Sequence, residues 1–365
     1  MLKELSPQEQ EHCRDLTTHL LDRTLYECEE LGLGTAHTGT HADLNCRRWR
    51  KLQSHPDVTL YADRSPGSAW IPAMNRDDWE QPVAVITVGE IKSSLDDVLL
   101  ALVSPDISTI KLRGVLMGRR PETNLTLLPI VTPTQASPFQ FLGVARFVNT
   151  QHWPLTMFVD PREMVLALAT GEVVTANRRR FGYEIILSVP LFKNSFMPRT
   201  QVVETRVFWE QPDGSVGMYS KLIVDITNHL PESVKQAMLC RGVMRFWKFI
   251  PRSVETKKLH WCLKHRKTLV RDIQPQSQVP GRDKCGGCCV STHKSQHGSP
   301  SKRKQSRCEL CDVWLCSKSS CRSACQITAV VRNESKKRQK DLTVCPRCMT
   351  FVRYQSAVNV ARPGS

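Results

Sequence analysis

The chain opens with apolar residues at helical spacing. In "SPQEQEHCRDLTTHLLDRTLYECEELGLG", Ser6 suits an N-cap, Pro7 the first helical position and Glu9 the third residue after the cap. The glycines of "LGLG" then end the run. This pattern predicts one amphipathic N-terminal helix of about 25 residues within positions 1–34, with an apolar stripe formed by Cys13, Leu16, Leu20, Leu21, Leu25 and Cys28.

From Arg48 onward the pattern changes to short runs of Val, Ile, Leu and aromatic residues, separated by Pro, Gly, Asn and Asp. Such runs predict strands of an antiparallel sheet. The segment "PDG" at Pro212–Gly214 predicts a hairpin turn, and "SLDDVLLALVSPD" predicts a short helix early in the series. The expected strands are "DVTLYADR", "PVAVITVGEI", "NLTLLPIVTP", "FQFLGVARFVN", "MFVDPREMVLALATGE", "RFGYEIILSVP", "VVETRVFWEQ" and "SVGMYSKLIVDI".

A one-sided helical stripe follows the last strand. The segment "PESVKQAMLCRGVMRFWKFI" repeats apolar residues every three or four positions, Pro251 then kinks or breaks the helix, and "VETKKLHWCLKHR" resumes it. A series of strands followed by a long amphipathic helix predicts an α+β domain in which the helix covers one face of the sheet. Such an arrangement leaves room for an apolar ligand between helix and sheet.

Net charge divides the chain unevenly. Residues 275–365 contain 17 Lys or Arg against 5 Asp or Glu, so this part carries +12 of the total charge of +16. The Gln- and Pro-rich stretch within 267–284 predicts a linker before this basic part. The charge indicates a polyanionic partner, either an acidic membrane surface or nucleic acid.

Neither the N-terminal segment nor the cysteine content is typical of a secreted protein. The N-terminus is charged from its third residue, and the longest apolar run, "VLLALV", is far shorter than the roughly 18 residues of a transmembrane helix. The 15 cysteines are odd in number, and ten of them lie between Cys285 and Cys348. We therefore expect a cytoplasmic protein in which clustered cysteines bind metal.

The cysteine cluster contains three C-x-x-C pairs: Cys285 with Cys288, Cys308 with Cys311, and Cys345 with Cys348. Two thiolates at this spacing can occupy neighbouring vertices of a tetrahedral zinc ion. Eight ligands make two zinc sites, and a module this small needs the metal to fold. The pairs Asp77–Asp78 and Asp96–Asp97 are explained by helix capping and solvation, and no catalytic constellation is apparent, so we expect no enzyme.

"CELCDVWLC" together with "VCPRC" resembles the FYVE zinc finger, a two-zinc FYVE/RING-like module, here over residues 285–353 with a tail at 354–365. The resemblance implies interleaved ligand pairs. Cys285 and Cys288 would share one zinc with Cys316 and either Cys321, which we favour, or Cys325. The second zinc would be bound by Cys308, Cys311, Cys345 and Cys348.

The large domain, over residues 48–266, resembles the START-like domains that precede FYVE-related fingers in oomycete proteins. The resemblance is carried in order by "VGEIKSSLDDVLLALVSP", "TPTQASPFQFLGVARFV", "DPREMVLALATGE", "RFGYEIILSVP" and "KKLHWCLKH". It implies a helix-grip fold with a lipid-sized tunnel.

The family's phosphoinositide-binding motifs are changed here. Ser306 and Arg307 stand at the positions of the paired histidines, and Thr343 replaces the last arginine. The basic residues Lys302, Arg303, Lys304 and Arg307 remain as candidates for contact with an anionic or phosphoinositide-containing surface.

These patterns predict a non-enzymatic zinc-binding lipid or membrane adaptor, cytoplasmic and peripheral on endosomal membranes. Nucleic acid is an alternative partner of the basic module, although the finger lacks the helix signature of a groove reader. A protein-interaction adaptor with purely structural zinc is the second alternative.

Overall fold

The computed structural model describes residues 4–33, 48–63, 79, 82–118, 123–149, 161–192, 197–225, 231–273, 284–288, 290, 306–316, 318, 321, 326–331 and 338–364. The chain divides into two compact units, Met1–Pro251 with Ala361–Gly364, and Arg252–Val360. We call them the sheet unit and the cysteine unit. The pair Asp77–Asp78 lies outside the described residues.

The N-terminal helix forms as its sequence predicts. Helix α1 spans Pro7–Glu30, and Ser6 and Glu9 form a reciprocal capping box. The Glu9 backbone N–H donates to Ser6 Oγ at 3.2 Å, and the Ser6 N–H donates to Glu9 Oε2 at 2.8 Å. At the other end Gly32 adopts a left-handed φ of 68°, which lets the Leu33 N–H donate to the Cys28 carbonyl at 2.9 Å.

The sheet unit is built on a nine-stranded antiparallel sheet in the order β1-β2-β3-β9-β8-β7-β6-β5-β4. The predicted hairpin turn joins β8 to β9, where Gly214 has a φ of 82°. The strands are β1 (Trp49–His55), β2 (Val58–Asp63), β3 (Pro82–Ile91), β4 (Thr123–Val131), β5 (Phe141–Asn149), β6 (Arg162–Val174), β7 (Arg180–Ser188), β8 (Gln201–Glu210) and β9 (Val216–Asp225).

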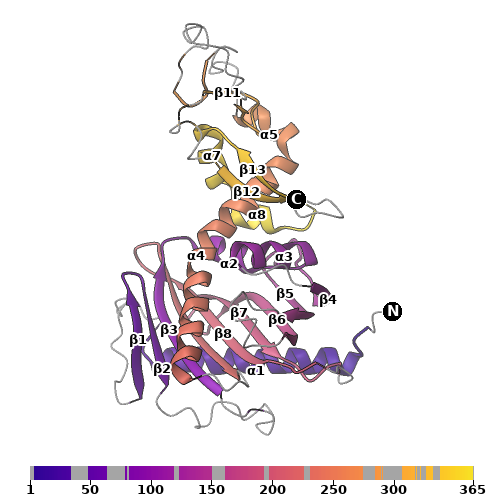
Figure 1. Ribbon diagram of the computed structural model, residues 1–365, viewed down its shortest axis with the longest axis vertical. Helices are drawn as coiled ribbons and strands as arrows, with labels where there is room; N and C mark the ends of the chain where they lie inside the picture. The colour runs from indigo at the N-terminus through magenta and orange to yellow at the C-terminus, as the bar shows by residue number, and fades with distance from the viewer. Residues whose placement is uncertain are drawn as a thin grey trace. The chain divides into compact units, whose positions relative to one another are not determined.

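Both faces of this sheet are apolar. Successive residues of a strand point to opposite faces, and neighbouring residues of these strands pack in different apolar clusters. On β8, Val203 packs in the cluster that contains Cys13 and Leu20 of α1. Its neighbour Val202 packs in the cluster that contains Leu239 of the C-terminal helix. Figure 1 shows α1 crossing one face of the sheet and that helix, α4, crossing the other. The strands are therefore near-continuous apolar runs.

Three helices lie on the α4 side of the sheet unit. Helix α2 (Leu95–Leu102) begins at Ser94, whose hydroxyl accepts from the Asp97 N–H at 3.2 Å. Helix α3 (Ile107–Leu116) begins at Asp106, whose side chain accepts from the backbone N–H groups of Ser108 and Thr109. Helix α4 runs without interruption from Glu232 to Lys264, with Pro251 inside it. The α+β class, a large antiparallel sheet with a long helix following its last strand, is confirmed.

The cysteine unit contains short elements. They are the second part of α4, α5 (Arg266–Ile273), β10 (Ser306–Arg307), β11 (Trp314–Leu315), β12 (Gln326–Val331), β13 (Arg338–Thr343), α7 (Pro346–Arg353) and most of α8 (Ala357–Ala361). Strand β10 pairs with β11, and β12 pairs with β13, both antiparallel. The first residues of the expected linker at 267–284 are thus helical in α5.

The sequence prediction lacked the short elements of the cysteine unit, β10 to β13, α7 and α8, and also β1, α3 and α5. Strand β1 is an edge strand with mostly exposed polar residues, so it lacks an apolar alternation. Helix α3 follows α2 after a short "SPD" break that reads as a loop. Helix α5 stands directly after His265 within a basic stretch. In each case tertiary packing adds stability that local sequence does not display.

Candidate metal centres and rim groove

The Cys308–Cys311 pair lies in a tight turn that closes the β10–β11 hairpin. The Asp312 N–H donates to the Cys308 carbonyl at 2.9 Å, and the Cys308 N–H donates to the Val313 carbonyl at 2.9 Å. Asp312 takes a left-handed φ of 61°, a conformation that Asp tolerates better than most residues. The turn places the two thiols of the C-x-x-C pair on one side.

The Cys345–Cys348 pair lies at the start of helix α7. Cys345 is the N-cap, its Sγ accepts from the Cys348 N–H, and Pro346 occupies the first turn. A helix N-terminus favours the anionic form of a thiol through its free N–H groups and dipole. The structure therefore holds both sulfurs at the positive end of a helix.

The sulfurs of these two pairs converge. Those of Cys308, Cys311, Cys345 and Cys348 all lie within 4.8 Å of one another, and the Sγ atoms of Cys311 and Cys345 are 3.7 Å apart. A second group, formed by Cys285, Cys288, Cys316 and Cys321, meets the same criterion. The grouping is the interleaved one expected from the zinc-finger resemblance, and each group can hold a metal ion.

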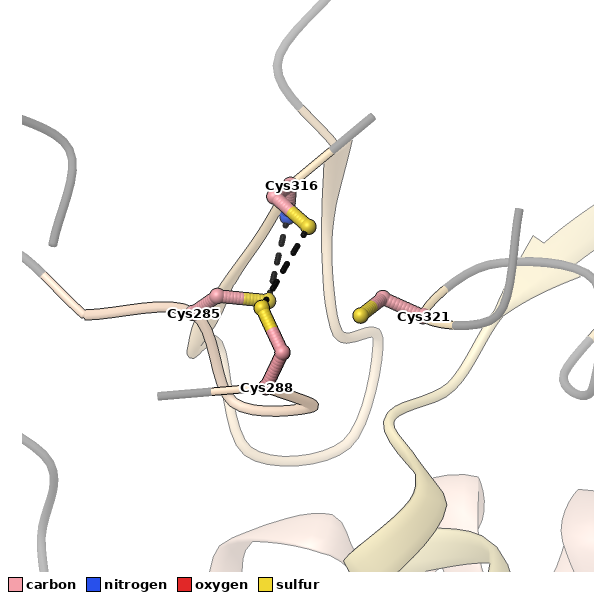
Figure 2. A group of neighbouring side chains, drawn as sticks. All are labelled: Cys285, Cys288, Cys316 and Cys321. Carbon is pink, nitrogen blue, oxygen red and sulfur yellow. Dashed lines mark hydrogen bonds between the residues drawn. The ribbon is translucent and has the colours of Figure 1, made fainter. Parts of the chain in front are cut away.

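Figure 2 shows the group formed by Cys285, Cys288, Cys316 and Cys321. The Sγ atoms of Cys288 and Cys316 are 3.7 Å apart. Cys321 is the fourth member of the group, while Cys289 and Cys325 lie outside the described residues. At Gly287 an added Cβ would lie 3.0 Å from Cys321 Sγ, so this turn needs glycine for the close approach.

Backbone N–H groups stabilise negative charge on two sulfurs. Cys285 Sγ accepts from the N–H groups of Cys316, at 3.3 Å, and Gly287, at 3.4 Å. Burial raises the pKa of Cys285, but these hydrogen bonds outweigh burial and lower it to about 6. Hydrogen bonds from the thiols of the other three cysteines lower the pKa of Cys308. Each group thus favours one thiolate, and four thiolates suit zinc or iron.

A small apolar core surrounds both groups. Leu310, Leu315, Val344 and Val352 are buried in it, and Trp314 packs against it. Leu259 of α4 is also fully buried in this core. Because the core has few large apolar side chains, bonds from cysteine to metal would supply much of the folding free energy of this unit.

Helices α4 and α5 also make polar contacts inside the cysteine unit. Lys258 Nζ donates to the Arg353 carbonyl at 3.0 Å, and Arg266 Nε donates to the Leu310 carbonyl at 2.8 Å. Arg353 forms an ion pair of 2.7 Å with Glu255. The second part of α4 is therefore an integral part of this unit, which the cysteine spacing does not indicate.

The predicted anion-contact residues are only partly described. Lys302, Arg303 and Lys304 lie outside the described residues. Arg307 is exposed and forms an ion pair of 3.1 Å with Asp312, itself exposed. Part of its charge is therefore already compensated within the finger.

A hollow of about 560 Å³ lies in the sheet unit between edge strand β1 and the first part of α4. We call it the rim groove. Leu52, Ala237 and Met244 contribute apolar surface, and Arg241 and Lys248 contribute positive charge. Its other lining residues are Gln53, His55, Ser233, Gln236 and Cys240. The sequence analysis did not find this site, because its two sides are about 185 positions apart in the chain.

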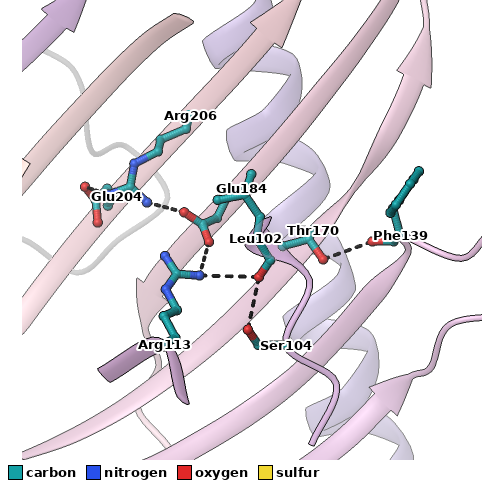
Figure 3. A network of polar contacts seen from close by, with 8 residues as sticks. All are labelled: Leu102, Ser104, Arg113, Phe139, Thr170, Glu184, Glu204 and Arg206. Atoms are coloured by element: carbon teal, nitrogen blue, oxygen red, sulfur yellow. Dashed lines mark hydrogen bonds and ion pairs between the residues drawn. The ribbon is translucent and has the colours of Figure 1, made fainter. Parts of the chain in front are cut away.

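Farther inside, the space between α4 and the sheet holds a buried ion network. Glu184 of β7 binds Arg206 of β8 and Arg113 of α3, and Arg206 also binds Glu204 (Figure 3). Burial raises the pKa of Glu184, but the two arginines outweigh it and lower this pKa.

Two phenyl rings of α4 cover these guanidinium groups. The Arg206 guanidinium lies 3.8 Å from the ring centre of Phe246, and that of Arg113 lies 5.4 Å from the ring centre of Phe249. Elsewhere on the same interface, Gly89 of β3 leaves no space for a Cβ beside Trp247. Helix α4 is thus packed closely on the sheet at these positions.

No helix within the described parts of the chain is both long and apolar enough to cross a membrane. No family model matches the sequence, and no curated protein matches it. Among solved structures, the chain is similar to human StAR-related lipid transfer protein 5, at 14% sequence identity and a TM-score of 0.44, over 67% of this chain and 97% of that one.

It is also similar to human STARD10, at 12% identity and a TM-score of 0.39, over 65% of this chain and 81% of that one. A STAR-related lipid transfer protein fragment from Xanthomonas axonopodis has 12% identity and a TM-score of 0.37, over 56% of this chain and 98% of that one. What the chain binds is therefore inferred from its own residues.

Proposed function

We propose that this protein is a non-enzymatic zinc-binding adaptor that also binds lipid. Its START-like sheet unit takes an apolar lipid, and its FYVE-related cysteine unit makes weak basic contact with anionic membranes, phosphoinositide-rich endosomal ones included. The observation that carries the proposal is the convergence of eight cysteines into two groups, each with four sulfurs within 4.8 Å.

Zinc has a structural role in this proposal. Four thiolates around one ion leave no coordination position for a water nucleophile, so the sites hold the fold together and do not catalyse hydrolysis. Metal analysis of the purified chain should find two zinc ions per molecule. A Cys311→Ser and Cys316→Ser double variant, with one ligand removed from each group, should retain far less zinc, and a full zinc content in this variant would contradict the proposed sites.

The lipid half of the proposal is supported by the architecture of the sheet unit. A long helix crosses an antiparallel sheet, and a hollow of ligand size, lined by apolar and polar side chains, lies beside it. Mass spectrometry of material co-purified with the full chain, and transfer of lipid between two vesicle populations, would test it. Absence of both co-purified lipid and transfer would contradict lipid binding.

Membrane contact is proposed for the basic segment that contains Lys302, Arg303 and Lys304. Each cation contributes about 1 kcal/mol near an anionic surface, and this attraction weakens with salt. Titration with phosphatidylserine vesicles should show that neutralising these three residues lowers binding at low salt. Arg307→Gln is the matched control, because Arg307 is already paired with Asp312. Tighter binding to RNA or duplex DNA than to vesicles would favour the nucleic-acid alternative.

A further inference from the structure

One face of helix α4 contributes both apolar and cationic side chains to the rim groove. Residues 233, 236, 237, 240, 241, 244 and 248 of α4 line it, spaced by three or four positions, so they form a single helical face. The other apolar residues of this helix, such as Val243 and Phe246, are buried against the sheet. The groove-facing stripe overlaps this buried stripe at Cys240 and Met244, whereas its members Ser233, Ala237, Arg241 and Lys248 are exposed.

The positive charge at the groove has no counterpart there. The lining contains Arg241 and Lys248 but no Asp or Glu. Both cations are exposed and two helical turns apart, and neither forms an ion pair with any residue in the described ranges. At the N-terminal end of α4 the Glu232 carboxylate, which is outside the lining, accepts from Gln236 Nε2 at 2.6 Å.

Three uncharged polar residues of the lining, Gln53, His55 and Gln236, are already hydrogen-bonded to each other or to neighbours. Gln236 Oε1 accepts from Arg50 Nη2 at 2.9 Å, and Gln53 Nε2 lies 2.8 Å from His55 Nε2. Burial raises the pKa of Cys240, which stays a neutral thiol. The floor therefore offers apolar contact, and the unused binding capacity is cationic.

We propose that the rim groove binds an anionic amphiphile, with its apolar chain over Leu52, Ala237 and Met244 and its carboxylate or phosphate group between Arg241 and Lys248. This inference rests on the proposed lipid binding and specifies its location and its ligand class. It places the ligand beside α4, because the interior between α4 and the sheet is occupied by the Glu184 network and the phenyl rings that cover it.

An acidic peptide is the competing occupant. It would add to the outer edge of β1, which pairs with no strand in the described sheet. The groove favours the amphiphile because its floor is apolar side chain, whereas strand addition depends on backbone hydrogen bonds and needs no such floor.

The test compares two probes with one chain length, oleate and oleyl alcohol, on the full zinc-loaded protein by fluorescence displacement or calorimetry. Wild type should bind oleate about tenfold more tightly, equivalent to about 1.4 kcal/mol. The double variant Arg241→Gln and Lys248→Gln should lose that preference and leave alcohol binding unchanged. Arg245→Gln, an exposed cation of the same helix outside the lining, is the matched control and should keep the preference.

A second variant tests the floor. Ala237→Trp places a large side chain in the groove from an exposed helical position and should abolish binding of both probes. Met244→Gln serves the same purpose with little change in volume and should weaken both. Unchanged oleate binding in these variants, or in the double Gln variant, would overturn the proposal. It would also be overturned if the wild-type chain bound a glutamate-rich peptide and did not bind oleate.

The outcomes also separate this inference from the proposed function. A co-purified lipid that Ala237→Trp still retains would support lipid binding by the sheet unit and overturn the groove as its site. A chain that binds neither probe and carries no lipid would overturn both.

Discussion

The two units of this chain reach a stable fold by different means. The sheet unit buries apolar side chains on both faces of nine strands, so hydrophobic burial alone can stabilise it. The cysteine unit has a smaller core, in which cysteines make up about half of the buried residues. Stabilisation by burial grows with the amount of apolar surface, whereas stabilisation by metal bonds does not. The proposed metal ions would therefore matter most in this small unit with eight converging thiols.

The largest expected effect is therefore confined to the cysteine unit. Removing zinc with a strong chelator, or changing Cys308→Ser, should remove on the order of 10 kcal/mol of folding free energy there. Hydrogen exchange followed by mass spectrometry should show loss of protection in α7 and β11 and unchanged protection in β6 and β7.

Cys262→Ala is the control for this experiment. Cys262 is fully buried in the same core but belongs to neither cysteine group, so the variant should keep both metal ions. Loss of protection in the strands of the sheet unit on chelation would show that the two units do not differ in this way.

The corresponding test destabilises the sheet unit by removing one of its buried charges. Glu184→Gln leaves Arg206 and Arg113 without their shared carboxylate in a buried site, which should cost about 3–5 kcal/mol. Urea denaturation monitored by exchange in β7 and β8 would measure it, with zinc content unchanged. Glu172→Gln removes a carboxylate from a partly exposed pair with Arg180 and should cost less than about 1 kcal/mol.

A pH dependence is expected for the sheet unit at Lys221. This residue is buried under α1, where its Nζ lies 3.1 Å from Glu27 Oε1. Burial lowers its pKa to about 7, against the opposing effect of Glu27, while an unfolded chain has a lysine pKa near 10.4. Between these values the unfolded state binds more protons, so the free energy of unfolding should rise with pH across this range.

Lys221→Met should flatten this rise, as measured by urea denaturation at pH 7, 8.5 and 10. Lys92→Met is the control, because Lys92 is exposed in its pair with Asp57. An equal pH dependence in wild type and Lys221→Met would exclude Lys221 as its source.

The smallest expected effect concerns the helix cap. Ser6→Ala removes one side of the capping box of α1 and should lower the free energy of unfolding of the sheet unit by about 1 kcal/mol. Thermal denaturation would measure it. A shift as large as that of Glu184→Gln would show that α1 contributes more than its cap accounts for.

Much of the architecture follows from local pattern. Ser6, Pro7 and Glu9 specify the start of α1, and the apolar runs specify eight of the nine strands, because helix caps and strand alternation are local properties. Edge strand β1 escaped prediction because polar residues dominate it. The sequence also predicted the order of the cysteine pairs, although only by its resemblance to a zinc finger.

By itself the sequence determined that three C-x-x-C pairs would be available and that a long helix would follow an antiparallel sheet, because spacing and periodicity are properties of neighbouring residues. Only the tertiary structure decided that Cys321 joins Cys285, Cys288 and Cys316, that Glu184 meets two arginines, and that β1 and α4 form a cationic groove. These contacts join residues far apart in the chain, and strand order and helix placement, which no local pattern encodes, determine which of them meet.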